Sequence, residues 1–374
     1  MNSADIPWDD VGSGWYVVMY DPSRANPASE ADVREGPPVL YLVNAAGERF
    51  EVAAWSPGQY LNLIDATATS ALVARIGSDF DETFYEVIDL ATGTATIAYT
   101  LRPPESLLDI WPHASLTRPS GENVVVHRSD GTTEWLERRT PDGTVISTIY
   151  EQPLNGQTAN MSWLYQPEGT SLVAVHQGGI AHVTNEGSML GELWAPPNTQ
   201  CDLVRWWDTD TILAACYGQD PSSAPLDEDG QAHLYYGRLW LLETDGSEGA
   251  ALTNLPDEPI SVVDFGYHDA WPKDDDTFLQ WWGDCGASGV ATLNPEGLGD
   301  LLAIEIPEDL EPGGSRIIDI HDGGMTLYGW QGCEGWIGIL FTVDLGGHYL
   351  DTLVPAIGDS RGVTGVIGLA TVHP

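Results

Sequence analysis

Short runs of alternating apolar and polar residues recur along the chain, and each run is broken by a tight glycine turn. YLVNAAGERFEVA at 41–53 and YEVIDLATGTATIAY at 85–99 are two examples. Alternation on both sides of a turn predicts an antiparallel hairpin, because glycine supplies the positive φ that such turns need. Seven such hairpins occur, with turn glycines at Gly47, Gly93, Gly143, Gly187, Gly246, Gly297 and Gly347.

A second hairpin precedes the glycine hairpin in four of the repeats. Its copies lie at 61–76, 161–177, 203–218 and 316–331. Consecutive strands joined by short turns pair antiparallel, so each repeat contributes four strands. Four-stranded units that recur about every fifty residues are typical of β-propellers. We therefore predict an all-β fold: a seven-bladed β-propeller with four antiparallel strands per blade.

The two ends of the chain predict how this ring closes. Residues 14–55 contain three strands of a blade, and residues 363–374 add one spare strand. A spare C-terminal strand that joins the N-terminal blade leaves no open sheet edge there. We expect an N-terminal tether at 1–12 and a single propeller domain at 13–374. A pair of β-sandwiches would explain neither the single period nor the spare strand.

One inner hairpin carries a motif that resembles a known family. The turn Gln166-Pro167-Glu168-Gly169 resembles the Ser-Pro-Asp-Gly turn of the TolB repeat, which joins the first two strands of a blade. Together with the repeat, it makes the chain similar to seven-bladed propellers of the TolB-like or WD40-like kind. The resemblance implies a ring with a central channel, which relatives use mostly to bind proteins, peptides or glycans.

The charge balance excludes two classes of partner. Lys and Arg number 14 against 56 Asp and Glu, a formal net charge of −42. Phosphate backbones and anionic lipid surfaces are repelled by such a protein, so nucleic acid is not an expected partner. The sequence also lacks an apolar stretch of about 18 residues, and we expect no membrane insertion.

The cysteines suggest a compartment and two cross-links. Four cysteines, a single lysine at Lys273 and a polar start up to Pro7 favour an extracytoplasmic protein, secreted or anchored, over a cytosolic one. Cys201 and Cys216 lie nearly opposite on one hairpin, where a disulfide is geometrically reasonable. Cys285 and Cys333 end equivalent strands of neighbouring repeats, and we expect them to pair across the blade boundary. Four buried thiols are the alternative.

Long loops predict which face binds. Links between second and third strands are long, notably 21–38, 77–84 and 218–237, whereas the opposite face has tight turns. Function concentrates on such loops. Aromatic residues near the ends of second strands would suit sugar rings or peptide side chains, although packing between blades explains any one of them more simply. These candidate binding residues are Tyr217, Tyr235, Tyr236, Trp281, Trp282, Trp330 and Trp336.

Motifs for catalysis or metal binding are weak. The G-x-S-x-G at 358–362 lies in a blade link without a following helix, so we interpret it as a polar turn. His113, His268 and His321 occupy similar places in their repeats, and turn capping explains them better than a metal site. Asp227, Glu228 and Asp229 are the candidate calcium ligands, although a solvated charge run is the simpler interpretation. We assign no catalytic residue and expect no cofactor other than calcium.

These observations favour a non-catalytic, extracytoplasmic propeller that binds a protein, peptide or glycan on its long-loop face. An acidic rim would select neutral or cationic partners. The alternative is a propeller-fold polysaccharide lyase or glycoside hydrolase. Tyr, His and Arg side chains that converge on one pocket would favour the enzyme, and an aromatic mouth with scattered charges would favour the binder.

Overall fold

The computed structural model describes most of the chain and consists almost entirely of β-strands. Its one helical element is the short 3₁₀ helix η2 (Trp8–Asp10), within the described residues. None of the helical structure described is long and apolar enough to cross a bilayer. The described residues are 5–21, 36–77, 82–102, 114–154, 161–176, 179–218, 237–254, 266–283, 287–306, 314–330, 338–354 and 366–371.

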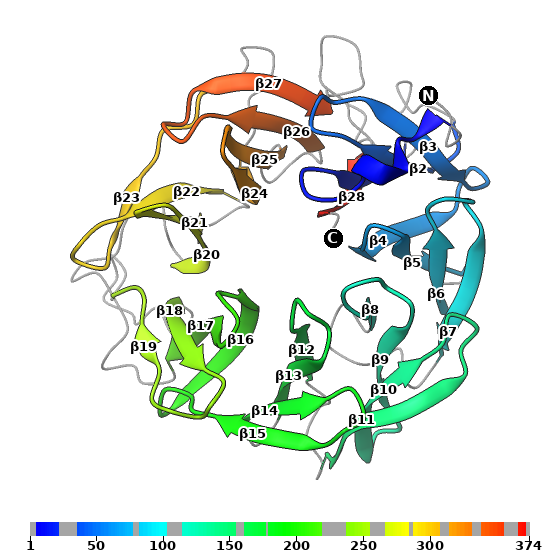
Figure 1. Ribbon diagram of the computed structural model, residues 1–374, viewed down its shortest axis with the longest axis horizontal. Helices are drawn as coiled ribbons and strands as arrows, with labels where there is room; N and C mark the ends of the chain where they lie inside the picture. The colour runs from blue at the N-terminus through cyan, green and yellow to red at the C-terminus, as the bar shows by residue number, and fades with distance from the viewer. Residues whose placement is uncertain are drawn as a thin grey trace.

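Four-stranded units follow one another around a central opening (Figure 1). The first contains β28 (Val366–Thr371), β1 (Tyr16–Tyr20), β2 (Val39–Val43) and β3 (Arg49–Ala54). The second contains β4 (Tyr60–Ala66), β5 (Ser70–Ile76), β6 (Thr83–Asp89) and β7 (Ala95–Leu101). The third contains β8 (Ala114–Leu116), β9 (Val124–Ser129), β10 (Thr133–Arg139) and β11 (Val145–Pro153).

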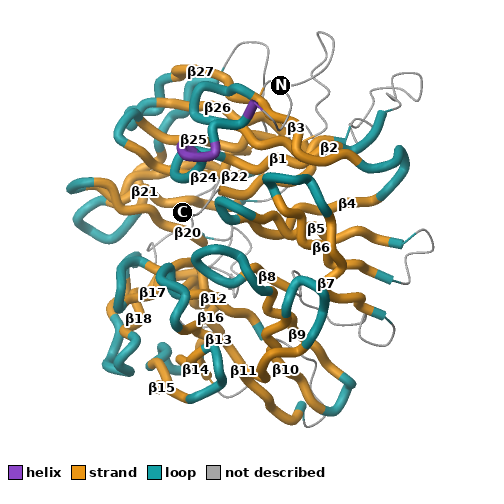
Figure 2. Tube along the Cα trace, turned by 45° about the vertical axis from the view of Figure 1, so that its right-hand side comes forward, coloured by secondary structure: helices purple, strands orange, loops and turns teal. Residues whose placement is uncertain are grey.

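The remaining units continue this order, and a turned view shows them set beside one another around the axis (Figure 2). The fourth contains β12 (Ser162–Tyr165), β13 (Ser171–His176), β14 (Gly179–Thr184) and β15 (Met189–Leu193). The fifth contains β16 (Thr199–Trp206), β17 (Thr211–Gly218), β18 (Gly237–Glu243) and β19 (Ala250–Ala251). The last two contain β20 (Tyr267–Lys273), β21 (Asp276–Trp282), β22 (Ser288–Leu293) and β23 (Gly299–Leu301), then β24 (Gly314–His321), β25 (Gly324–Trp330), β26 (Gly338–Val343) and β27 (Tyr349–Val354).

The last two units form a single eight-stranded sheet. They meet through one parallel pair, Ser288 with Gly314, between β22 and β24. Buried Gln280 reinforces this junction: its Nε2 donates to the Ser315 carbonyl at 2.7 Å, and its Oε1 accepts the Ile317 N–H at 2.8 Å. A buried amide with both ends satisfied holds the two units in one register.

The C-terminal strand joins the N-terminal sheet. β28 pairs antiparallel with β1, with Thr371 opposite Tyr16. Apolar residues of β1 and β2 pack in one buried cluster with residues of β24, β26 and β27. At the other side of the first sheet, Ile6 is buried in the core cluster, and Trp8 packs against it. The part of the expected tether that the structure describes therefore contributes to the core.

Several turn glycines lie where one unit packs closely against the preceding unit. All seven predicted turn glycines have positive φ, as the sequence indicated. At Gly93, with φ +68°, an added Cβ would lie 2.4 Å from the Val52 carbonyl oxygen in β3. At Gly347, with φ +87°, it would lie 2.3 Å from the Ala303 carbonyl oxygen. These positions need glycine for the left-handed backbone and for the close approach of a neighbouring strand.

Candidate functional site

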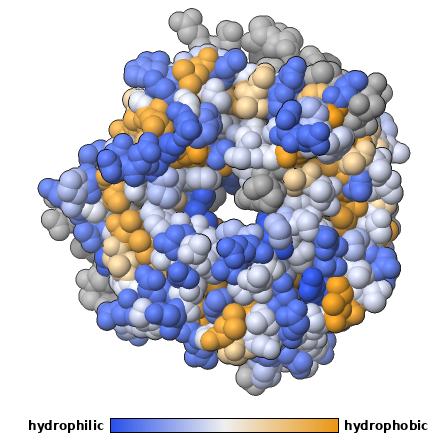
Figure 3. Space-filling view, viewed as in Figure 1, coloured by the Kyte–Doolittle hydropathy of each residue, from blue (hydrophilic) through white to orange (hydrophobic). Residues whose placement is uncertain are grey.

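A cavity lies at the centre of the described residues, and an opening is visible there in the space-filling view (Figure 3). The cavity has a volume of about 650 Å³. Its lining comes from the innermost strands β4, β8, β12, β16, β20, β24 and β28, and from residues just after some of them. Cavities of this size hold small ligands or a short length of chain.

A repeated irregularity places charged side chains on this channel. In four innermost hairpins the pairing register shifts by one residue, as in a β-bulge. A bulge turns the following side chain in a new direction. The residue after the shift is charged in each case: Asp65, Arg205, Asp269 and Asp319.

Three of these four residues belong to two ion pairs between neighbouring units. Arg118 donates to both carboxylate oxygens of Asp65, at 2.7 and 3.0 Å. Arg205 likewise donates to both oxygens of Asp269, at 2.8 Å from Nε and 2.5 Å from Nη2. Its guanidinium also lies 3.3 Å from the ring centroid of Trp271. Each pair therefore clamps two adjacent units at the channel wall.

Burial disfavours the charged forms of Asp269 and Asp319. It raises the pKa of Asp269, although Arg205 lowers that pKa through its charge and its hydrogen bonds. Burial also raises the pKa of Asp319, which His321 and the Ile320 N–H lower in part. Arg205 holds the Asp269 carboxylate through two hydrogen bonds, while burial keeps the pKa of Asp269 above its usual range.

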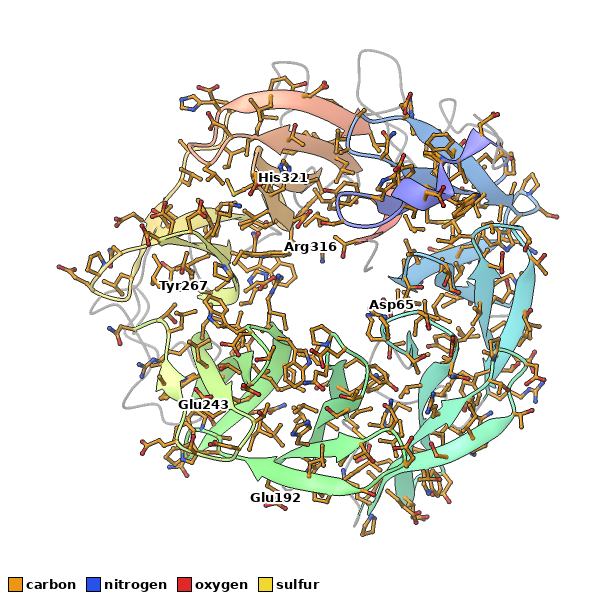
Figure 4. The ribbon with its side chains drawn as sticks, viewed as in Figure 1. Asp65, Glu192, Glu243, Tyr267, Arg316 and His321 are labelled. Carbon is orange, nitrogen blue, oxygen red and sulfur yellow. A yellow bond between two sulfur atoms is a disulfide. The ribbon has the colours of Figure 1, made fainter. Side chains whose placement is uncertain are left out.

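Arg316 differs from every other arginine in the described ranges. Its side chain reaches from β24 into the opening, across from Asp65 (Figure 4). It is exposed to the channel, yet the surrounding ring lowers its pKa by desolvation, and the charge of Arg205 lowers it further. Asp269 and Tyr328 raise this pKa. No described side chain forms a hydrogen bond or ion pair with Arg316, and both oxygens of the neighbouring Asp269 accept from Arg205.

Three tryptophans, Trp163, Trp206 and Trp271, supply the aromatic part of the wall together with Tyr165. Trp163 is oriented by a hydrogen bond from its Nε1 to Ser115 Oγ at 2.7 Å. One face of Trp271 is covered by Arg205. The wall thus combines fixed aromatic rings with a guanidinium that has no partner in the described chain, a combination typical of recognition sites.

Among the predicted aromatic anchors, Trp282 is the exposed one in the described chain, at 46%. Its ring stacks on His268 with a centroid separation of 4.8 Å. Trp281, its neighbour, packs on Gly289 of the adjacent strand and against the core. Tyr217 also packs on that core cluster, and Trp330 lies partly buried beside Tyr328. Tyr235, Tyr236 and Trp336 lie outside the described residues.

The other predicted site residues have mixed outcomes. The Cys201–Cys216 disulfide is confirmed, and the two residues are direct partners in the β16–β17 register. Cys285, Cys333 and the calcium candidates Asp227, Glu228 and Asp229 lie outside the described residues, as does the segment 358–362. Within the described ranges, no group of three or more His, Cys, Asp or Glu residues is arranged to hold a metal.

The prediction that the three histidines are equivalent was wrong. His321 does serve a turn, since its Nδ1 accepts the Gly323 N–H at 3.1 Å. His268 instead lies inside β20, at the bulged position that Ile64, Val204 and Ile318 occupy elsewhere. Burial lowers its pKa to about 4, and the charge of Arg316 adds to this effect. His113 lies outside the described residues.

Sequence reasoning missed the channel charges themselves. Asp65, Arg205, Asp269 and Arg316 all lie in first strands of repeats, where charged residues are unexpected in a buried hairpin. That conflict between a charged residue and an apolar strand was the available signal. The bulge that precedes Asp65, Arg205 and Asp269 leaves no mark in the apolar alternation.

Comparison with known structures identifies the fold. The chain is similar to the β-propeller domain of the Trilobed protease from Pyrococcus furiosus, with 12% identity and a TM-score of 0.50 over 88% of this chain and 90% of that one. This is a β-propeller fold. A putative 6-phosphogluconolactonase from Bacteroides uniformis is also similar, with 12% identity and a TM-score of 0.51 over 95% and 98%. A puromycin-hydrolyzing peptidase from Mycobacterium tuberculosis matches with 12% identity and a TM-score of 0.51 over 95% of this chain and 56% of that one.

At 12% sequence identity, the similarity to these structures shows the fold alone. No protein-family model matches the sequence, and no curated protein is significantly similar to it. Function must therefore be argued from the site.

Proposed function

We propose that this chain is a non-catalytic, extracytoplasmic β-propeller that binds a protein, peptide or glycan partner at its channel. In this proposal the four-stranded units form a closed seven-bladed ring of the TolB-like or WD40-like kind. The β28–β1 pairing and the apolar cluster between β1–β2 and β24–β27 support closure. The Cys201–Cys216 disulfide supports an oxidising compartment.

The state of the channel charges is the observation that favours binding over catalysis. Asp65 and Asp269, the carboxylates that line the cavity, are both held in bidentate pairs with arginines. A general acid or base needs a carboxyl that is free to exchange a proton with substrate. Arg316, in contrast, has no such pair and faces the cavity. The channel therefore offers a recognition group and keeps its acids engaged.

A polysaccharide lyase or glycoside hydrolase is the second candidate, and one observation favours it. His268 and Tyr328 both interact electrostatically with Arg316, so the three side chain types that such a lyase would use are neighbours. Burial, however, raises the pKa of Tyr328 and lowers that of His268 to about 4. Tyr328 thus stays protonated and His268 is a weak base, which is a poor arrangement for proton abstraction at neutral pH.

The test is a thermal-shift screen against glycans, cationic peptides and divalent metals, with a chelator control. A ligand that binds the folded state raises the unfolding midpoint. We expect a rise with one ligand class, reduced in Trp163→Ala, which removes a ring of the cavity wall, and retained in Ile146→Ala, which changes an exposed side chain of the outer strand β11. Turnover of the bound glycan would establish the enzyme instead. No shift, and no partner in a pull-down, would overturn the binding function.

A further inference from the structure

Arg316 is the strongest unassigned feature of the channel. The other arginines in the described ranges have hydrogen bonds, ion pairs or ring contacts, for example Arg75 with Glu86 at 2.7 Å and Arg102 with Glu82 at 2.6 Å. In a protein with net charge −42, carboxylates are abundant, yet none of those described pairs with Arg316. A guanidinium inside a ring, partly removed from bulk water, is stabilised by an anionic partner.

The geometry around Arg316 favours an oxyanion from outside the chain. Its guanidinium presents a planar set of donors that matches a carboxylate or a phosphate. The neighbouring carboxylate, Asp269, is occupied on both oxygens by Arg205. Arg205 also interacts with Asp319 and lowers the pKa of Arg316 through its charge, whereas Arg316 has no ion-pair partner among the described residues. An anion bound at Arg316 would supply that partner.

We propose that Arg316 binds the C-terminal carboxylate of a peptide segment that enters the channel. This inference rests on the proposed binding function and names its ligand. The carboxylate would pair with the guanidinium, and the preceding side chains would lie against the aromatic wall that includes Trp163 and Trp271. A cavity of about 650 Å³ accommodates the last few residues of a chain and excludes a folded domain.

The charge of the whole protein favours a peptide terminus over a polyanion. A net charge of −42 repels ligands that carry many negative groups, such as polyuronates or nucleic acids. A peptide end carries a single obligatory carboxylate and can be neutral or basic elsewhere. A peptide with basic side chains is attracted by the acidic exterior and still supplies the one anion that Arg316 lacks. Capture of a C-terminal carboxylate is an established mode of peptide recognition, and a guanidinium matches a carboxylate in geometry.

The experiment compares two pools of N-acetylated pentapeptides with randomised sequence, identical except that one ends in a free carboxylate and the other in an amide. The immobilised full chain selects from each pool, and mass spectrometry identifies what is retained. A third pool with an amidated end and one internal Asp separates a terminal from a side-chain carboxylate. Inorganic phosphate and an oligouronate are offered as competitors.

Matched variants locate the interaction. Arg316→Gln removes the charge from the channel, and Arg316→Lys keeps it. Arg102→Gln makes the same change in net charge at a side chain that is 63% exposed and paired with Glu82, away from the cavity lining. The unfolding midpoint of each variant shows whether it folds. We expect Arg316→Gln to be folded, because it removes a partly desolvated charge that has no partner in the described chain.

The expected result is retention of the free-carboxylate pool at least about tenfold above the amidated pool. That preference should vanish in Arg316→Gln, persist in part in Arg316→Lys and be unchanged in Arg102→Gln. Equal retention of all pools, or a preference that survives in Arg316→Gln, would overturn the inference and leave the binding function standing. Phosphate or oligouronate binding at Arg316 without any peptide binding would also overturn it. Failure of every peptide, glycan and protein would remove the proposed function itself.

Discussion

Arg205 and Asp269 join the fifth and sixth units across the channel wall through two parallel hydrogen bonds, of 2.8 and 2.5 Å. Their side chains are 24% and 15% exposed, so the pair is largely screened from bulk water. Both residues follow a register shift in their strands. The same local irregularity thus supplies both halves of a contact between two consecutive units.

Removal of one half of this pair should cost more than removal of both. Arg205→Met leaves the Asp269 carboxylate desolvated and without its main partner, and we expect the free energy of unfolding to fall by about 2 kcal/mol. Asp269→Asn should cost a similar amount. In the double variant the two losses should not add. Urea unfolding of the four proteins gives the coupling energy, and strictly additive losses would show that the pair contributes nothing.

The turn glycines make a second quantitative test. Gly93→Ala places a Cβ at φ +68° and 2.4 Å from the Val52 carbonyl oxygen, so backbone strain and a backbone clash act together. We expect a loss of about 3 kcal/mol or more. Gly58→Ala is the matched control, because Gly58 has φ +80° with open space around it. It should lose about 1 kcal/mol from strain alone. Equal losses in the two variants would contradict the role of the close approach.

The disulfide between Cys201 and Cys216 should stabilise the fifth unit. It closes a loop with a sequence separation of 15, and both residues are buried. Chain-entropy arguments give about 3 kcal/mol for a loop of this length. The Cys201→Ala/Cys216→Ala variant should therefore unfold at lower urea concentration, and added reductant should shift the unmodified chain in the same direction. A variant as stable as the parent would show that packing alone holds this hairpin.

The local features of the fold were predictable from the sequence, whereas the site was not. The turn glycines and the Cys201–Cys216 pair depend on spacing within one hairpin, which alternation and turn chemistry reveal. The exposure of Trp282 and the partial burial of Trp281 were undecided, because adjacent residues of a strand point to opposite sides and both sides of a blade can be covered.

Placement of Arg316 required the three-dimensional structure. Its neighbours in β24 are buried, and a register shift follows at Ile317. That shift redirects the later side chain of Asp319 and leaves Arg316 in the alternation of β24, and a single sequence does not show which side of this strand faces the channel. The sequence also suggested that His268 matched His113 and His321, because an alignment by residue type ignores where each strand begins.

His268 makes the stability of the protein depend on pH. Its pKa is lowered from 6.5 to about 4, first by burial and second by the charge of Arg316. As the pH falls below 6.5, the unfolded chain takes up a proton at this histidine before the folded one does. The folded state therefore loses stability between about pH 6.5 and pH 4, by at most about 3 kcal/mol. Asp269 and Asp319 act in the opposite direction, since their raised pKa values favour the folded state as they become protonated.

Comparison of the parent chain with His268→Gln separates these effects, because both proteins retain the aspartates. We expect the parent to lose more stability than the variant when urea unfolding is measured at pH 7 and at pH 4.5. An NMR titration of His268 in Arg316→Gln should show a pKa higher than in the parent, since a positive neighbour has been removed. An unchanged His268 pKa would mean that desolvation alone lowers it and that the charge of Arg316 does not act on His268.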